Sequence, residues 1–357
     1  MIIRQHQRVL VARAREQARN NDYARAFVRL ARTHVAGPRG VLLQAQSRGD
    51  DGRLDTHANA AIEASKALSE DSSRPLDNRA IAGNRYPPGS TFKIITTAAA
   101  LRTGKIKPDQ EVDAPDTITL PGTSHSLENY GGESCGGGRT TFSKAFAESC
   151  NTPFAQLAIN VGEEELSKEA KNWGFDSDLS IPLKVTPSTY PHNDSQAQTA
   201  MAGIGQASVQ ATPLMMAMVA ATVANKGEQM TPYLVSRTLD PDLNEVSSTS
   251  TKVARTPIDS ATASSLSSLM QTAVAEGTGT SAQVSGVQVA GKTGTAETGT
   301  DSGPTTWFVG FAGTDIDKPE IALAVVLDGN AETEDGATGG KIAGPVAAQV
   351  IDAAVNQ

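Results

Sequence analysis

A serine and a lysine stand three residues apart in the stretch YPPGSTFKII, residues 86–95. Two prolines and a glycine interrupt any preceding helix, and the apolar run that follows predicts a buried helix over residues 90–102. Residues three apart share a helix face, so the Ser90 hydroxyl and the Lys93 amine can meet there. A neutral amine can take the hydroxyl proton, which makes serine a nucleophile without a histidine. An N-capping serine beside a solvated lysine is the simpler alternative.

Two further stretches carry polar side chains that could complete such a site. AESCNTPFAQL (147–157) places Ser149 and Asn151 where one predicted helix ends and another begins. VAGKTGTAETG (289–299) places four such residues on a predicted strand: Lys292, Thr293, Gly294 and Thr295. Taken singly, the first pair could be a helix cap, and the second group could be an ordinary strand end.

Together the three motifs resemble the signature of the penicillin-recognising serine enzymes. Ser-x-x-Lys, Ser-x-Asn and Lys-Thr-Gly each occur once, in the order found in that family. Their surroundings are similar to class B penicillin-binding proteins: RYPPGSTFK, SCNTPFAQL, TPLMMAMVAATVANKG, and KTGTAETG followed by TWFVGFAG. The resemblance covers about residues 50–357. It is nearest to the PbpA type, a D,D-transpeptidase in which an NYGG…C stretch precedes Ser-Cys-Asn, here ENYGGESC at 128–135.

The resemblance implies acyl transfer from the D-alanyl-D-alanine end of a peptidoglycan stem peptide. Ser90 attacks the carbonyl and forms an acyl-enzyme, and β-lactams acylate the same hydroxyl. Lys93 is the expected proton acceptor, because burial and a nearby Lys292 would lower its pKa. Ser149 would bridge the two amines and relay the proton to the leaving amine. The Asn151 amide would hold the substrate peptide and donate to Lys93.

The lysine-threonine-glycine strand is expected to bind the rest of the substrate. Lys292 and the Thr293 hydroxyl would bind its C-terminal carboxylate. The backbone N–H groups of Ser90 and Thr295 would form the oxyanion hole, as in the family. An exposed edge of the strand would let the peptide add as a further strand. We expect no cofactor and no metal, since the five histidines are scattered and HExxH and CxxC are absent.

Two other functions use the same motifs. A serine β-lactamase needs a deacylation base, usually on a Glu-x-x-Leu-Asn loop, and residues 240–244 (DPDLN) mimic this with aspartate. We interpret that stretch as a turn, so the acyl-enzyme would wait for an amine acceptor. A penicillin-sensor domain or a decayed homologue would bind muropeptide without turnover.

The elements that must position these residues belong to a mixed α/β (α+β) fold. Helical patterns cover residues 90–102, 141–149, 152–171, 212–226, 258–276 and 342–356, and strand patterns cover 287–297, 307–313 and 321–329. Short polar turns between the last strands favour an antiparallel meander, and the apolar final strand requires a covering helix. The resemblance implies a β-lactamase/transpeptidase-like fold, with an antiparallel sheet flanked by helices and an all-helical subdomain.

Composition limits the partners and the domain organisation. The net charge of −8 and an aromatic content of 4% argue against nucleic-acid binding. Residues 1–49 contain ten arginines and no lysine. We therefore predict a basic segment over 1–55, unlike the family and either a truncated or out-of-frame start or a genuine arm, followed by a transpeptidase domain over 56–357.

The family is exported, which implies the extracytoplasmic face of the membrane. It also implies glycosyltransferase, divisome or elongation partners. No apolar run in this chain approaches 18 residues, and its start lacks an apolar signal-peptide core, so we predict neither a transmembrane nor a signal segment here.

Cys135 and Cys150 are the only cysteines, and the second lies between Ser149 and Asn151. Glycines around the first give the connecting chain freedom to turn. In an extracytoplasmic domain a disulfide is permitted, and it would fix the turn that presents Ser149 and Asn151. Two reduced, buried cysteines are the alternative.

Overall fold

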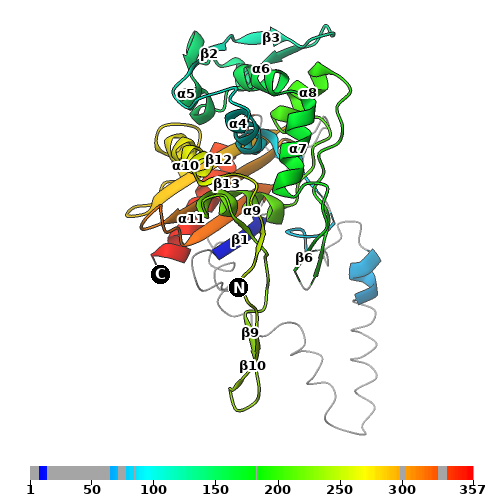
Figure 1. Cartoon of the computed structure of the whole chain (residues 1–357), viewed down its shortest axis with the longest axis vertical. Helices are drawn as coiled ribbons and strands as arrows, with labels where there is room; N and C mark the ends of the chain where they lie inside the picture. The colour runs from blue at the N-terminus through cyan, green and yellow to red at the C-terminus, as the bar shows by residue number, and fades with distance from the viewer. Residues whose placement is uncertain are drawn as a thin grey trace.

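The computed structural model describes residues 8–13, 65–70, 78–83, 85–181, 183–297, 303–328 and 336–356. Of the predicted basic segment 1–55, only residues 8–13 fall within this description. Figure 1 shows a central sheet with a helical region at one end of the molecule and a projecting hairpin at the other.

The central sheet contains the predicted meander. Its strand order is β1-β14-β13-β12. The antiparallel strands β12 (Gln288–Ala296), β13 (Thr305–Gly313) and β14 (Ile321–Leu327) match the three predicted strands. The fourth strand, β1 (Arg8–Arg13), runs parallel beside β14. Because β12 lies at the end of this order, one of its edges is left without a strand neighbour among the described residues.

Helices cover both faces of this sheet, as the apolar β14 predicted. Alternate residues of β14 enter two separate cores, Ala322, Ala324 and Val326 on one face and Ile321, Leu323 and Val325 on the other. On the first face they pack with α9 (Pro213–Ala224) and α10 (Ser260–Ala275). On the second face they pack with α11 (Gly339–Val355). Such burial on both faces removes the alternation of polar residues that a one-sided sheet would show.

The helical region holds α4, which follows Ser90, and its neighbours. It consists of α4 (Lys93–Arg102), α5 (Phe142–Ala147), α6 (Asn151–Val161), α7 (Glu163–Trp173) and α8 (Gln196–Gly203). The single helix predicted over 152–171 was wrong. Gly162, at φ 89° and ψ 155°, separates α6 from α7, and three glutamates favour a new helix N-terminus immediately after it.

Several two-stranded pairs lie outside the central sheet. The helical region is not all-helical, since it carries β2 (Glu111–Ala114) with β5 (Gly138–Thr141) and β3 (Thr117–Thr119) with β4 (Ser126–Glu128). Elsewhere β6 (Leu179–Ile181) pairs with β7 (Leu183–Val185), and β8 (Gln229–Met230) pairs with β11 (Val253–Arg255). The projecting hairpin is β9 (Arg237–Leu239) with β10 (Glu245–Ser248).

Candidate active site

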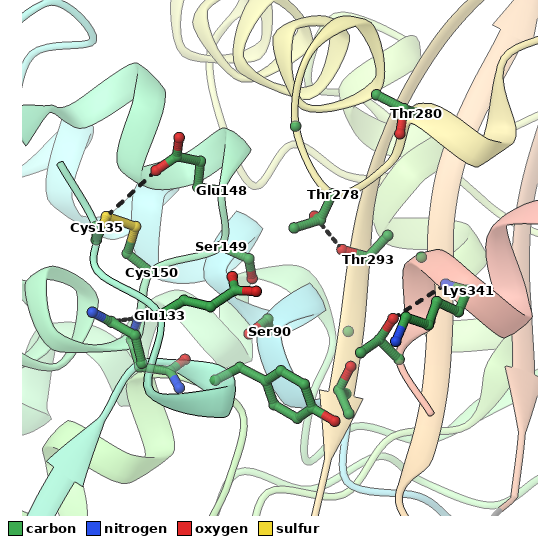
Figure 2. Close-up of a pocket in the computed structure, with 18 of the residues that line it drawn as sticks. Ser90, Glu133, Cys135, Glu148, Ser149, Cys150, Thr278, Thr280, Thr293 and Lys341 are labelled. Atoms are coloured by element: carbon green, nitrogen blue, oxygen red, sulfur yellow. Dashed lines mark hydrogen bonds between the residues drawn. A yellow bond between two sulfur atoms is a disulfide. The ribbon is translucent and has the colours of Figure 1, made fainter. Parts of the chain in front are cut away.

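A cavity of about 970 Å³ lies between the helical region and β12. Ser90, Ser149 and Thr293 line it together, although they come from segments far apart in the chain. Figure 2 shows Ser90 between Ser149 on the helical side and Thr293 on the strand. The loop after α10 and the start of α11 form the rest of the strand side of the cavity.

Ser90 lies on a tight turn that is held against β12. The turn is the 3-10 helix η1 (Gly89–Phe92), which leads directly into α4. Gly89 has φ +52°, and a Cβ there would lie 2.9 Å from Thr295 O. A Cβ on Gly294 would lie 2.9 Å from Pro88 O. Glycine at both positions therefore allows the turn that carries Ser90 and the strand to approach with backbone against backbone.

The Ser90 hydroxyl makes no hydrogen bond within the described part of the chain, and the residue is 9% exposed. The predicted contact between this hydroxyl and the Lys93 amine is therefore not formed as a hydrogen bond. The hydroxyl nevertheless lines the cavity, so a ligand can reach it.

Lys93 is fully buried and binds the turn between α5 and α6 instead. Its Nζ donates to Ser149 O at 2.7 Å, to Cys150 O at 2.9 Å and to Asn151 Oδ1 at 2.9 Å. The predicted donation from the Asn151 amide to Lys93 is wrong in direction, because the amide oxygen accepts from Lys93. The amide nitrogen of Asn151 donates to Glu128 O at 3.1 Å.

Ser149 connects the two lysines as predicted, but through two different atoms. Its hydroxyl accepts from Lys292 Nζ at 2.7 Å, whereas its carbonyl accepts from Lys93. Ser149 has φ +62°, a left-handed backbone that residues other than glycine rarely adopt. Through this conformation the turn presents a side chain to one amine and backbone to the other.

Burial of the two lysine amines lowers their pKa values. Desolvation and the nearby Lys292 hold the pKa of Lys93 well below its usual range. Desolvation lowers the pKa of Lys292 to about 7. The faces of Phe154 and Phe146 lie 5.1 and 5.7 Å from the two Nζ atoms, and such contacts recover only part of the lost hydration. Desolvation and the charge of Lys292 thus oppose the ammonium form of Lys93. Its three acceptors favour that form, because a neutral amine has only two hydrogens, so Lys93 must give up one of these hydrogen bonds to act as a base.

The strand side presents two hydroxyls to the cavity. Thr293 Oγ1 lies 2.5 Å from Thr278 Oγ1, and Thr295 Oγ1 accepts from Gly339 N at 3.1 Å. Gly294 lines the cavity between them. The structure therefore brings together all eight residues predicted for catalysis and substrate binding.

Cys135 and Cys150 form a disulfide, with a Cα separation of 6.1 Å. The bond joins the chain before β5 to the residue between Ser149 and Asn151. The two cysteines lie 15 residues apart, and a loop of that length stabilises a fold by about 3 kcal/mol in the chain-entropy model.

Asn129 and Thr278 are functional candidates that local sequence patterns did not reveal. The Oδ1 of Asn129 accepts from the N–H groups of Asn151 and Thr152, at 2.8 and 3.1 Å. It therefore caps α6 from outside, since the N-cap residue Cys150 supplies no side-chain bond. For Asn129 the only sequence signal was its place in the ENYGGESC stretch that carries the family resemblance. Thr278 lies in none of the motifs found in the sequence.

The sequence that mimics a β-lactamase base lies elsewhere. Residues 240–244 form the turn of the β9–β10 hairpin, as predicted, with Asp240 Oδ1 accepting from the N–H groups of Asp242 and Asn244. None of these residues lines the cavity.

Comparisons with known proteins agree with this geometry. The family described as "Penicillin binding protein transpeptidase domain" matches residues 40–352. The peptidoglycan D,D-transpeptidase PbpA of Mycolicibacterium smegmatis is 41% identical over 314 residues, covering 86% of this chain and 63% of that protein. PbpA of Mycobacterium tuberculosis is 41% identical over 324 residues, covering 88% and 64%. The chain thus spans less than two thirds of the length of these curated relatives.

Solved structures give the same result. Penicillin-binding protein A from M. tuberculosis, as a ceftriaxone acyl-enzyme complex, superposes with a TM-score of 0.77 at 40% identity, covering 86% of this chain and 67% of that one. A D,D-transpeptidase domain from Eggerthella lenta gives 0.73 at 32% identity, covering 83% and 70%. With a family match over most of its length and the three motifs gathered at one cavity, this chain belongs to the penicillin-binding protein transpeptidase domain family.

Proposed function

We propose that this chain is a peptidoglycan D,D-transpeptidase that crosslinks stem peptides through an acyl-enzyme on Ser90. The observation that supports this most is the placing of two buried amines on either side of Ser149, beside a cavity that opens on Ser90. Curated relatives at 41% identity are named peptidoglycan D,D-transpeptidases, and solved relatives are acyl-enzyme complexes with β-lactams.

The acylation step follows from the charges of the site. Ser90 Oγ attacks the carbonyl carbon of the penultimate D-alanine, and its proton passes to the neutral Lys93. The developing oxyanion is held by the N–H groups of Ser90 and Thr295, and losing one such donor typically costs about 3 kcal/mol. When the C–N bond breaks, the Ser149 hydroxyl gives its proton to the leaving D-alanine amine and takes one from the Lys292 ammonium that donates to it, while Lys93 keeps the proton of Ser90. The serine ester that remains is the acyl-enzyme.

The second half-reaction transfers the acyl group to an amine. A stem-peptide amine attacks the ester carbonyl, the new amide forms, and Ser90 recovers its proton.

The strand side of the cavity binds the acyl donor before acylation. The Lys292 ammonium and the Thr293 hydroxyl bind its C-terminal carboxylate, and Gly294 and Thr295 complete the strand. The free edge of β12 gives an extended peptide a place to pair.

The setting of the reaction is part of the proposal. Among the described residues, no helix is both long and apolar enough to cross a bilayer. We place the domain on the extracytoplasmic face of the membrane, where its peptidoglycan substrate and a disulfide are both expected. A glycosyltransferase of the division or elongation machinery is the proposed protein partner.

Penicillin labelling combined with a crosslinking assay tests the function. The wild-type chain, incubated with benzylpenicillin, should gain one penicilloyl adduct by intact-protein mass spectrometry and should join a D-alanyl-D-alanine peptide to an amine acceptor. Ser90→Ala should gain no adduct while keeping the wild-type circular dichroism spectrum. An adduct on Ser90→Ala would move the nucleophile elsewhere. Rapid hydrolysis of penicillin would identify a β-lactamase, and no labelling of the wild type would identify a decayed homologue.

A further inference from the structure

Thr278 lies in the loop between α10 and the 3-10 helix η3 (Thr280–Ala282), and it lines the cavity. Figure 2 shows its side chain pointing to Thr293, with the two hydroxyl oxygens 2.5 Å apart. The N–H of Thr278 donates to Ala147 O at 3.0 Å, two residues before Ser149. Thr278 therefore contacts both the strand motif and the segment that leads into the Ser149 turn.

The loop has little room to place Thr278 anywhere else. A Cβ on Gly277 would lie 2.2 Å from Ala147 O, and a Cβ on Gly340 would lie 2.5 Å from Thr278 O. Backbone from α5 and from the first turn of α11 thus packs against the loop on both sides. These contacts fix the backbone of Thr278, and hence the Cβ from which its hydroxyl extends.

The number of hydrogens on each hydroxyl decides whether Thr293 can also donate to a ligand in the cavity. Each threonine hydroxyl donates one hydrogen and can accept two. If Thr293 donated to Thr278, it would have no hydrogen left for an anion in the cavity. If Thr278 donates to Thr293, the Thr293 hydrogen is free to point into the cavity. Within the described part of the chain, the only other acceptor of the Thr278 hydroxyl is Ala147 O, which lies 3.4 Å away and is the weaker alternative.

Thr295 shows the same arrangement. Its Oγ1 already accepts from Gly339 N–H at 3.1 Å, which leaves its own hydrogen for the cavity. The two hydroxyls of the strand motif are thereby held as donors by groups behind them. A chain of two hydrogen bonds ending on an anion is stronger than the last bond alone, because each donor polarises the next.

We infer that Thr278 is a positioning residue, which orients the Thr293 hydroxyl so that its hydrogen meets the carboxylate of the acyl donor. The inference rests on the proposed function, since it assigns this carboxylate to the strand side of the cavity. Because Thr278 acts on the carboxylate through Thr293 and not on the reacting carbonyl, its loss should weaken binding and leave the chemical step unchanged.

The test compares benzylpenicillin with its methyl ester, which lacks the anionic carboxylate. Thr278→Val removes only the hydroxyl, and Thr278→Ser restores it. For benzylpenicillin, Thr278→Val should raise the apparent dissociation constant about tenfold, the usual effect of losing a hydrogen bond to a charged group. The acylation rate constant should not change. For the methyl ester both constants should match those of the wild type, and Thr278→Ser should behave like the wild type with both compounds.

The possible results distinguish a wrong role for Thr278 from a wrong proposed function. Thr272→Val, which removes a hydroxyl bonded only to Ser268 O within α10, is the matched control and should have no effect. Equal losses with acid and ester would show a merely structural role and would overturn the inference. So would an unchanged dissociation constant in Thr278→Val. Absence of wild-type labelling would instead reject the proposed transpeptidase.

Discussion

At the scale of single residues, Lys93 and Lys292 have opposite requirements within one site. In its proposed role as base Lys93 must be neutral, whereas Lys292 must carry its proton to bind a carboxylate as proposed. Burial lowers both pKa values, and the charge of Lys292 lowers that of Lys93 further. The proposed roles require Lys93 to lose its proton before Lys292 does as the pH rises, so that the active combination exists between the two deprotonations.

This order predicts a pH profile that depends on the substrate. With benzylpenicillin, the second-order acylation rate constant of the wild type should rise as Lys93 deprotonates and fall above a pH of about 7 as Lys292 deprotonates. With the methyl ester the fall should disappear, because no carboxylate needs the ammonium. In Lys292→Arg the fall should also disappear, since guanidinium keeps its proton. An alkaline fall of equal size for acid and ester would contradict this division of roles.

The sequence revealed the chemical groups at this scale but not their contacts. Ser90, Lys93, Ser149, Asn151 and Lys292 were all predicted from three short motifs. The acceptors of Lys93 were not, because two of them are carbonyl groups 56 and 57 residues further along the chain. No side-chain pattern encodes a backbone carbonyl, nor the positive φ of Ser149 that turns it toward the amine.

At the scale of elements, an ion pair joins the nucleophile helix α4 to α7. Arg102 at the end of α4 donates to Glu165 at 2.6 Å and to Glu169 at 2.7 Å. The Glu169 side chain is fully buried, and it also accepts from Trp173 Nε1 at 2.9 Å. Burial raises the pKa of Glu169 in spite of Arg102.

We predict that Arg102→Met will destabilise the fold by about 3 kcal/mol at neutral pH, because it leaves a buried carboxylate without its cation. The loss should be smaller near pH 5. A carboxyl whose folded pKa is raised is tolerated best when protonated, and removing Arg102 raises that pKa further. Urea unfolding at pH 5 and pH 8 measures the difference.

An exposed ion pair provides the control for this experiment. Arg139 and Glu111 lie 3.0 Å apart with side chains 66% and 63% exposed. Arg139→Met should therefore change stability by no more than about 1 kcal/mol at either pH. Equal effects of the two substitutions would mean that the α4–α7 pair contributes no more than a surface contact.

Strong hydrophobic patterns in the sequence predicted the long helices and strands correctly. The short strands, whose patterns are weak, were not predicted. The apolar strands β12–β14 and the helices α9, α10 and α11 follow their patterns within a few residues. The pairs β2–β5 and β3–β4 have strands of three or four residues, and their pairing partners set them more than their own composition does. The break at Gly162 was missed because the apolar pattern continues across it.

At the scale of the whole molecule, the two edges of the sheet have different neighbours. The β12 edge borders the cavity, where we propose that a peptide adds. The outer edge of β14 is paired with β1, whose residues fall in the predicted basic segment 1–55. All proposed site residues lie in 56–357, which we propose as the transpeptidase domain.

We predict that a chain beginning at residue 56 will still be acylated by penicillin at Ser90, because its site is complete. It should associate with itself, since the backbone groups of β14 lose their partner and an unpaired strand edge invites pairing. Intact mass spectrometry reads the acylation and size-exclusion chromatography with light scattering reads the association. A folded but unlabelled truncated chain would show that the first segment contributes to the site.

The close contact of η1, β12 and α11 has a consequence for the evolution of drug resistance. A Cβ at Gly339 would lie 2.4 Å from Trp307 O and 2.5 Å from Gly294 O, and a Cβ at Gly89 or at Gly294 would lie 2.9 Å from a backbone oxygen. If β-lactams fill the cavity as proposed, selection cannot readily alter these three positions without displacing the nucleophile turn. Resistance by substitution would instead be expected at other residues that line the cavity, such as Thr280 and Lys341.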